Sequence, residues 1–249
     1  MTADDLRARF GSLGAEDVAA LDHAAVAGGV LVLQLMEIAG FQVARCAWEY
    51  LGLQPGRVVA VAGRGNNGGD ALVAARHLVT WGCTVDALLL WQDEPEVGPA
   101  LAQARAAQGS GVVCARTLDP NVIAETCAAA DLVIDGILGT GLRSAPREPL
   151  ASVIRSVNAA GTAVLSVDIP SGMDAGTGEA FDPCVRAART CTLAAVKAGL
   201  WAPQSAAIAG DLWAADIGMP RYAWHAVGLH LPTALRGGAL LPVPSATSH

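Results

Sequence analysis

The 249-residue sequence is poor in charge and in aromatic side chains. Charged residues make up 16% of it and aromatic residues 4%, whereas hydrophobic residues make up 53%. This composition excludes a disordered chain, because disordered segments combine low hydrophobicity with high charge. The formal net charge of -7 argues against a nucleic acid as the main partner, since a phosphate backbone requires a basic protein face.

Long uninterrupted hydrophobic runs are also absent. The most apolar stretch, residues 24–44, contains Gln34, Glu37 and Gln42, whereas a membrane span needs about 20 nearly continuous apolar residues. The first ten residues, MTADDLRARF, lack the basic-then-apolar layout of a secretory signal. We therefore expect a cytoplasmic protein with no membrane partner.

Neither cysteine nor histidine occurs in a metal-binding pattern. The six cysteines form no C-x-x-C pair and lie mostly among apolar neighbours, which predicts reduced core residues. The five histidines form neither an H-x-E nor an H-E-x-x-H pattern, so a zinc site is not expected. Ser171 lacks G-x-S-x-G surroundings and a nearby histidine, which argues against acyl transfer.

Short apolar runs rich in β-branched residues alternate with alanine-rich segments of helical length. The runs predict buried strands at residues 58–63, 84–90, 111–116, 132–137 and 163–169, followed by strands at 189–195 and 212–218. The intervening segments predict helices at 70–81, 98–109, 120–130 and 147–160, and residues 15–52 predict two N-terminal helices. The alternation implies right-handed crossovers, and hence an α/β fold: a three-layer α/β/α sandwich around a mostly parallel sheet.

The last part of the chain has a different character. From residue 219 onward the sequence contains proline and glycine without a clear period. We predict one domain over residues 1–220 and a loosely packed or mobile tail over residues 221–249.

The segment after the first predicted strand indicates a phosphate-containing ligand. Gly63, Gly65 and Gly68 spell G-x-G-x-x-G between a strand and a helix, where glycines let the backbone approach a phosphate and the helix start attracts its charge. The string NNGGD at residues 66–70 adds two amides and an acid that a ligand-free turn does not need. A dehydrogenase is disfavoured, because the acid expected about 20 positions beyond the glycines is Asp93, which comes late and in a loop.

Carboxylates follow two later strands, at the sheet edge where open α/β folds bind ligands. Asp135 precedes a second glycine turn, GTGLR at residues 139–143, whose arginine could offset phosphate charge. Asp168 ends an apolar strand, where desolvation would raise its pKa toward the range useful for proton transfer. A structural capping role is the alternative for both acids.

Two further observations suggest polar chemistry at this edge. Asn67, Asp135 and Ser171 offer hard oxygen atoms, which suit an alkali or alkaline-earth cation. Lys197 is the only lysine in the chain and would suit a site that needs a compact charge or a proton donor. Chance retention in a solvated loop is the alternative for this lysine.

Taken together, these motifs resemble the NAD(P)H-hydrate epimerase family, also called NAD(P)HX epimerases. The matching segments are NNGGD at 66–70, Asp135 with GTGLRSA at 139–145, VDIPSGMDAGTG at 167–178 and Lys197 with the following AGL. The similarity extends from LMEIAG at 35–40 to DIGMP at 216–220. It implies a Rossmann-like sandwich and an isomerase that interconverts the R and S forms of hydrated NADH or NADPH at C6 of the damaged nicotinamide ring. This metabolite-repair step feeds a separate dehydratase.

The resemblance also implies site residues. It places the substrate, NAD(P)HX, on Asn66, Asn67, Gly68, Gly69, Asp70, Gly139, Thr140, Gly141, Leu142, Arg143, Ser144, Ala145 and Asp168. It places a potassium ion on Asn67, Asp135 and Ser171. Asp168 is expected to act as the general acid and base, with Lys197 as a second catalytic group near the ring.

Three positions depart from the family pattern. Ile38, Ala71 and Ala188 stand where the family usually has Asn, Gly and Asp, and these changes could remodel the pocket. The alternative function is therefore a catalytically degenerate nucleotide-binding or scaffold module, as in apolipoprotein A-I-binding proteins. The sequence leaves open whether NADHX or NADPHX is preferred and whether the chain forms a homodimer.

Overall fold

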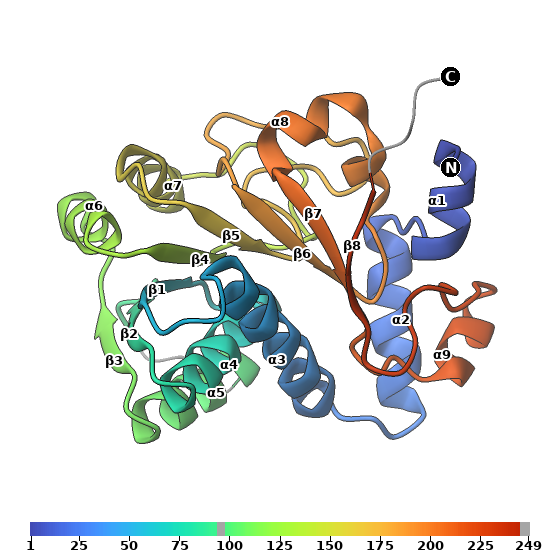
Figure 1. Ribbon diagram of the computed structural model, residues 1–249, viewed down its shortest axis with the longest axis horizontal. Helices are drawn as coiled ribbons and strands as arrows, with labels where there is room; N and C mark the ends of the chain where they lie inside the picture. The colour runs from blue at the N-terminus through green and yellow to red at the C-terminus, as the bar shows by residue number, and fades with distance from the viewer. Residues whose placement is uncertain (94–97, 245–249) are drawn as a thin grey trace.

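One eight-stranded sheet organises the residues that the computed structural model describes, 1–93 and 98–244 (Figure 1). Its strands lie in the order β3-β2-β1-β4-β5-β6-β7-β8, parallel except for β8, which runs antiparallel to β7. The bounds are β1 Arg57–Ala62, β2 Thr84–Leu89, β3 Val113–Arg116, β4 Leu132–Gly136, β5 Val164–Val167, β6 Arg189–Leu193, β7 Asp211–Ala215 and β8 Leu240–Pro242. The α/β prediction is confirmed, and all seven predicted strands are present.

Helices cover both faces of the sheet and complete three layers (Figure 1). One face carries α3 (Val32–Tyr50), α4 (Asn66–Thr80) and α5 (Pro99–Gly109); the other carries α6 (Pro120–Ala128) and α7 (Leu150–Ala159). Alternate residues of β1 supply the two cores, since Val58 packs in the cluster of the first face and Val59 in that of the second. None of the described helices has both the length and the apolar character needed to cross a membrane.

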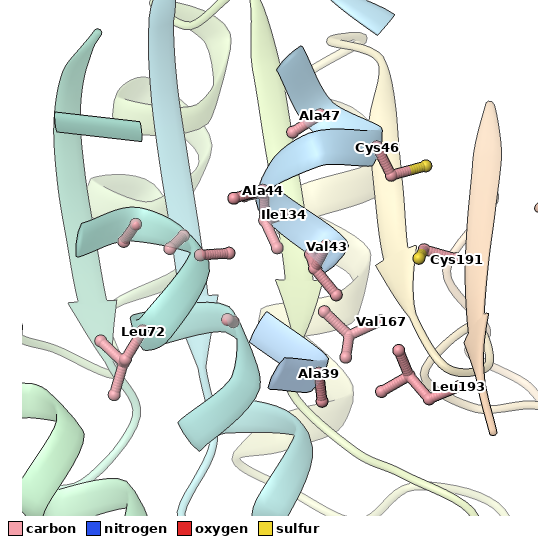
Figure 2. Packing of buried hydrophobic residues seen from close by; sticks show 14 of the residues in the cluster. Ala39, Val43, Ala44, Cys46, Ala47, Leu72, Ile134, Val167, Cys191 and Leu193 are labelled. Atoms are coloured by element: carbon pink, nitrogen blue, oxygen red, sulfur yellow. The ribbon is translucent and has the colours of Figure 1, made fainter. Parts of the chain in front are cut away.

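Small side chains let α3 lie close to the sheet and to α4. Figure 2 shows Ala39 and Val43 of α3 beside Val167 of β5. At Gly40 a Cβ atom would lie 2.3 Å from Cβ of Val73 in α4, so only glycine fits this crossing. This close packing fixes the position of α4, whose first turn follows β1. The first turn lies at the edge of the sheet where the sequence places the candidate site residues.

An N-terminal arm, residues 1–14, precedes the two predicted helices. The arm holds α1 (Ala3–Phe10), which the sequence did not predict, and α2 (Ala15–Ala27) and α3 then follow as expected. Thr2 and Asp5 form a capping box that starts α1. The arm ends as a short β-bridge from Leu13 to Lys197, in which the Leu13 N–H donates to the Val196 carbonyl at 3.0 Å.

The C-terminal segment is more ordered than its sequence predicts. Helix α9 (Arg221–Ala226) and β8 lie in the stretch expected to be loosely packed, and Trp224 is only 2% exposed. The Gln42 side-chain amide donates to the carbonyls of Asp216 and Gly238 at 2.8 and 3.1 Å, which ties this segment to α3. The expectation was wrong for residues 221–244 because their buried side chains are isolated rather than periodic. The rest of the expected tail, residues 245–249, lies outside the described residues.

Tyr222 joins α9 to α2, and its hydroxyl donates to the Ala25 carbonyl at 2.8 Å. We expect Tyr222→Phe to lower the free energy of unfolding by about 1 kcal/mol, the usual net value of one such hydrogen bond. Urea denaturation followed by fluorescence measures it. An unchanged midpoint at an unchanged slope would show that α9 contributes nothing to stability through this contact.

The strand order creates a crevice at one edge of the sheet. From β1 the chain proceeds through α4 to β2 on one side, whereas β4 is followed by α7 and β5 on the other side. Such a switch point, outside the carboxyl ends of the strands, is where open α/β sheets bind ligands. The turns after β1, β4 and β5 all open here.

Candidate active site

The turn between β1 and α4 brings two backbone segments into close contact. A Cβ atom at Gly63 would lie 2.1 Å from the carbonyl oxygen of Ile137, and one at Gly68 would lie 1.9 Å from the oxygen of Gly63. Packing therefore requires glycine at both positions. Helix α4 starts at Asn66, after the extended Gly65, and its first-turn N–H groups carry the partial positive charge of a helix start.

Two cavities open at this edge and share Asn66, Asn67 and Thr140 as lining residues. The acidic cavity, of about 500 Å³, is also lined by Asp22, Asp70, Asp168 and Lys197 and by apolar side chains of α2 and α3. The glycine cavity, of about 620 Å³, is lined by residues 63–68 and 137–141 together with Gln92 and Asp93. Their shared boundary makes one continuous site, with the ionic groups at one end and the two glycine turns at the other.

The structure brings together most of the sequence-predicted residues. Asn66, Asn67, Asp70, Thr140, Asp168 and Lys197 line the acidic cavity, and Gly68, Gly139 and Gly141 line the glycine cavity. Gly69 instead faces Met36, whose sulfur would lie 2.5 Å from an added Cβ. The remaining predicted residues are not among the described residues that line either cavity: Leu142, Arg143, Ser144 and Ala145. Arg143 lies near Asp174 instead. The pKa of Asp174 is lowered mainly by the hydrogen bond from the Thr177 N–H and, to a smaller extent, by the charge of Arg143.

Asp168 and Lys197 form a buried ion pair in the acidic cavity. Oδ1 of Asp168 accepts hydrogen bonds from Lys197 Nζ and, at 2.9 Å, from the Leu193 N–H. Lys197 Nζ also donates to the Leu193 carbonyl at 2.6 Å. Asp168 is 6% exposed and Lys197 1%, so each offsets the desolvation cost of the other. The loop alternative for Lys197 is therefore wrong, because its ammonium group is enclosed.

The backbone at Asp168 is in the left-handed region, with φ 66°. This conformation is uncommon for a residue other than glycine and costs of order 1–3 kcal/mol, and such strain concentrates at functional sites. The Asp168 N–H donates to the Cys191 carbonyl of β6 at 2.8 Å. The neighbouring strand thus holds a strained residue whose side chain lines the cavity.

Asp135 lines neither cavity and is fully buried. Its carboxylate accepts hydrogen bonds from Ser171 Oγ at 2.6 Å, the Ser171 N–H at 2.9 Å and Ser166 Oγ at 2.8 Å. Burial raises the pKa of Asp135, and the hydrogen bonds from Ser171, Ser166 and Ile137 act in the opposite direction. No arginine or lysine among the described residues forms an ion pair with it. A buried carboxylate of this kind is well suited to a neighbouring cation.

The three predicted potassium ligands belong to one network. Asn67 Nδ2 donates to the Val167 carbonyl at 2.7 Å and to the Leu138 carbonyl at 3.4 Å. Ser171 Oγ, which donates its proton to Asp135, lies 3.2 Å from that same Leu138 oxygen. The network contains carboxylate, hydroxyl and carbonyl oxygens together with the Asn67 amide group, and these are the kinds of group that suit a hard cation such as potassium.

Asp70 is a buried acid that faces the acidic cavity and is only 6% exposed. Its carboxyl has no hydrogen-bond or ion-pair partner within the part of the chain that the structure describes. Burial raises the pKa of Asp70 well above its ordinary value, and the Asp168 and Asp22 carboxylates raise it further, whereas Lys197 lowers it. Ionised Asp70 therefore opposes folding.

This direction predicts a pH-dependent gain in stability for Asp70→Asn. Because the folded-state pKa is raised, the contribution of Asp70 to stability is complete below its ordinary value of 3.8 and is lost as pH rises through the folded-state value. At pH 8 we expect Asp70→Asn to unfold at higher urea concentration than the wild type. Its free energy of unfolding should be greater by at least about 1 kcal/mol, since one pKa unit corresponds to about 1.4 kcal/mol. The difference should vanish near pH 4; a variant less stable at pH 8 would contradict it.

Sequence reasoning missed one charged residue of the site. Asp22 of α2 lines the acidic cavity, but no motif includes it and it lies 44 positions before Asn66 in the numbering. Its position between the buried Leu21 and Ala25 would have placed it near a core-facing helix surface. That signal does not show which other residues the helix faces.

The three departures from the family pattern lie on α3, on α4 and just before β6. Ile38 is 40% exposed on α3. Ala71 is buried beside the turn after β4, where its Cβ would lie 2.6 Å from a Cβ at Gly136. Ala188 precedes β6, and its carbonyl accepts from the Asp211 N–H at 3.0 Å. None of the three is among the described residues that line the two cavities.

Comparison with known proteins places this chain in a family. A model of the family described as YjeF-related protein N-terminus matches residues 32–199. An NAD(P)H-hydrate epimerase of Cenarchaeum symbiosum is 39% identical over 199 residues, which cover 77% of this chain and 88% of that protein. An NAD(P)H-hydrate epimerase of Pirellula staleyi is 38% identical, with 81% and 89% covered.

Longer relatives and a solved structure agree with this assignment. The bifunctional NAD(P)H-hydrate repair enzyme Nnr of Moorella thermoacetica is 38% identical over 192 residues, but the match spans only 36% of that protein. The crystal structure of the yeast protein YNL200c superposes with a TM-score of 0.80 at 22% identity, covering 93% of this chain and 99% of that one. That similarity shows a shared fold. The chain therefore belongs to the YjeF-related protein N-terminus family and, because it is similar over most of its length to proteins named NAD(P)H-hydrate epimerase, to the NAD(P)H-hydrate epimerases.

Proposed function

We propose that this protein is a cytoplasmic isomerase that interconverts the R and S forms of hydrated NADH or NADPH at C6 of the damaged ring. The observation that carries the proposal is the buried Asp168–Lys197 ion pair, in a cavity that shares Asn66, Asn67 and Thr140 with the glycine cavity. The epimerase names of relatives at 38–39% identity support it. The six free cysteines are consistent with a reducing compartment.

The two cavities match the two ends of a dinucleotide. We place the hydrated nicotinamide ring in the acidic cavity, where Asp168 and Lys197 supply polar groups among apolar side chains of α2 and α3. The diphosphate then lies at the start of α4, where free N–H groups favour negative charge. The adenosine end lies in the glycine cavity.

The proposed reaction is acid–base catalysis at C6. Asp168 takes a proton from the Lys197 ammonium through their direct hydrogen bond and passes it to the C6 hydroxyl. The C6–O bond breaks, and water leaves with the bonding electrons while the N1 lone pair forms a planar iminium. Water then adds to either face, and its extra proton returns to a carboxylate. Proton transfer by a positioned side chain contributes about 10²- to 10⁴-fold in rate. Lys197 keeps the Asp168 carboxylate oriented through their direct hydrogen bond.

We propose that Asn67, Asp135 and Ser171 hold the potassium ion. When bound, the cation would balance the buried Asp135 charge and add positive potential near the substrate diphosphate. Asn67 connects the two regions, because it belongs to the oxygen network and also lines both cavities. We further propose that dehydration of the S form is carried out by a different polypeptide, with which this protein is functionally paired.

The proposal is tested by incubating purified protein with a pure R hydrate and following the S form by chiral chromatography, with and without potassium. Conversion faster than in protein-free buffer, and stimulated by potassium, supports the epimerase. Binding of the hydrate without conversion would contradict it and favour the binding-module alternative. Sodium at equal ionic strength is the control for the cation.

A further inference from the structure

Asp22 is a carboxylate of the acidic cavity that lies outside the sequence motifs described above. It reaches the cavity from α2, whereas Asp168 follows the carboxyl end of β5. Helix α2 also lines the cavity with Val18 and Val26, so it forms a wall distinct from the sheet edge. The residue lies outside the segment 32–199 that matches the family model.

The Asp22 carboxyl is free to bind a ligand. It has no hydrogen-bond or ion-pair partner among the residues that the structure describes. Burial raises the pKa of Asp22, Lys197 lowers it and Asp168 raises it, so the charges of these groups act on one another within the cavity. Apart from the exposed His23, the titratable groups that line this cavity are Asp70, Asp168 and Lys197.

A second observation indicates that the cavity is built for a polar ligand. Asp70, on α4, is more than nine-tenths buried, has no partner in the described chain and lines the same cavity. An unpaired buried carboxyl costs folding free energy, so a ligand that satisfies it would recover this loss. The cavity therefore presents acids from α2, from α4 and from the loop after β5 to one volume of about 500 Å³.

Epimerisation at C6 has a stereochemical requirement that one acid does not meet. The leaving hydroxyl lies on one face of the ring, and the water that gives the other epimer adds to the opposite face. Each face needs a group that can donate or accept a proton within hydrogen-bond reach. Asp168 is fixed by Lys197 and the Leu193 N–H, so it serves one face.

We propose that Asp22 is the second catalytic acid–base residue and serves the ring face turned away from Asp168; this inference rests on the proposed function. In one direction Asp168 gives its proton to the departing hydroxyl. Water then forms the new C6–O bond on the other face, the N1–C6 double-bond electrons return to N1, and Asp22 takes the released proton. Solvent exchange restores both carboxyl groups. The reverse reaction exchanges their roles.

The test separates exchange on one face from inversion between faces. Each pure epimer is incubated in H₂¹⁸O with wild type, Asp22→Asn or Glu16→Gln, and both ¹⁸O uptake at C6 and epimer composition are followed above the uncatalysed rate. Glu16→Gln, an exposed acid on the same helix, is the matched control. Asparagine keeps the shape of Asp22, and circular dichroism verifies that the variant is folded.

We expect Asp22→Asn to lower epimerisation by about 10²-fold or more and to abolish ¹⁸O uptake from one epimer only. From the other epimer, uptake with retention should remain within about threefold of wild type, because Asp168 still expels and returns water on its own face. Wild-type epimerisation by folded Asp22→Asn, or equal loss of uptake from both epimers, would overturn the assignment. Failure of the wild-type protein itself to exchange or epimerise would instead refute the proposed function.

Discussion

Asp168→Asn is expected to lower kcat/KM for epimerisation by about 10²- to 10⁴-fold, the range that general acid–base catalysis contributes. An amide can neither donate a proton to the C6 hydroxyl nor recover one from water. It retains an oxygen that can accept the hydrogen bonds from Lys197 and the Leu193 N–H, so the pocket should keep its shape. Substrate binding is expected to change less than kcat.

Stability and activity must be measured together for this variant. Removing one partner of a buried ion pair costs about 3–5 kcal/mol when the other is left uncompensated, and Lys197 is only 1% exposed. Urea unfolding therefore accompanies the kinetic assay, which is performed where the variant is folded. Asp174→Asn is the matched control, because Asp174 lies in the same loop but accepts its hydrogen bonds from Gly176 and Thr177. A folded Asp168→Asn variant with wild-type kcat would eliminate Asp168 as the acid.

Gly68→Ala is expected to destabilise the protein by at least about 3 kcal/mol, beyond the usual cost of one added methyl group in a packed core. The new Cβ would lie 1.9 Å from the Gly63 carbonyl oxygen. That oxygen belongs to backbone whose own N–H donates to the Gly136 carbonyl at 2.9 Å, so the clash is not relieved by rotating a side chain. The start of α4 would have to move away from β1.

Gly65→Ala provides the comparison, since it makes the same chemical change three residues earlier. A Cβ at Gly65 would meet nothing within 4 Å, and its φ of −86° suits alanine. We expect its free energy of unfolding to stay within about 1 kcal/mol of wild type or to increase slightly. Urea denaturation of both variants checks the pair. If Gly68→Ala were as stable as Gly65→Ala, close packing of this turn would not be what requires glycine at position 68.

The central elements could be predicted from the sequence because each is determined mainly by its own residues. A fully buried parallel strand such as β1 is a continuous apolar run, and the long helices that follow have enough length to show their character. Gly65, which caps α4, and the asparagines of its first turn, Asn66 and Asn67, are likewise neighbours in the chain, so one short motif contains them. Because β4 and β5 are parallel, their carboxyl ends lie at the same edge of the sheet. The positions of Asp135 and Asp168 at that edge could therefore be predicted from the strands alone.

The elements that the sequence did not predict depend on distant partners. Helix α1 buries only Leu6 and Phe10, which is too few for a recognisable period. Strand β8 has three residues and is defined by its pairing with β7, and α9 has six residues. Their stability comes from tertiary packing, which outweighs weak local preference in short elements.

The candidate site shows the same division. Residues joined by a motif, such as 66–70, could be assigned together, whereas Asp22 comes close to Asp168 only because α2 packs across the sheet edge. Leu142 to Ala145 show the converse. They belong to a motif, but their loop carries them away from the cavity walls, and their part in binding stays a prediction.

The bridge between the N-terminal arm and Lys197 makes the site sensitive to local opening. Hydrogen bonds from Leu13 to the Val196 carbonyl, from Val196 to the Phe10 carbonyl and from Ala198 to the Leu13 carbonyl cover both sides of the lysine. Segments held by a few backbone hydrogen bonds open at lower free energy than the core itself unfolds. Local opening of this bridge would therefore hydrate the lysine while the sheet, and the far-ultraviolet circular dichroism that it produces, remained intact.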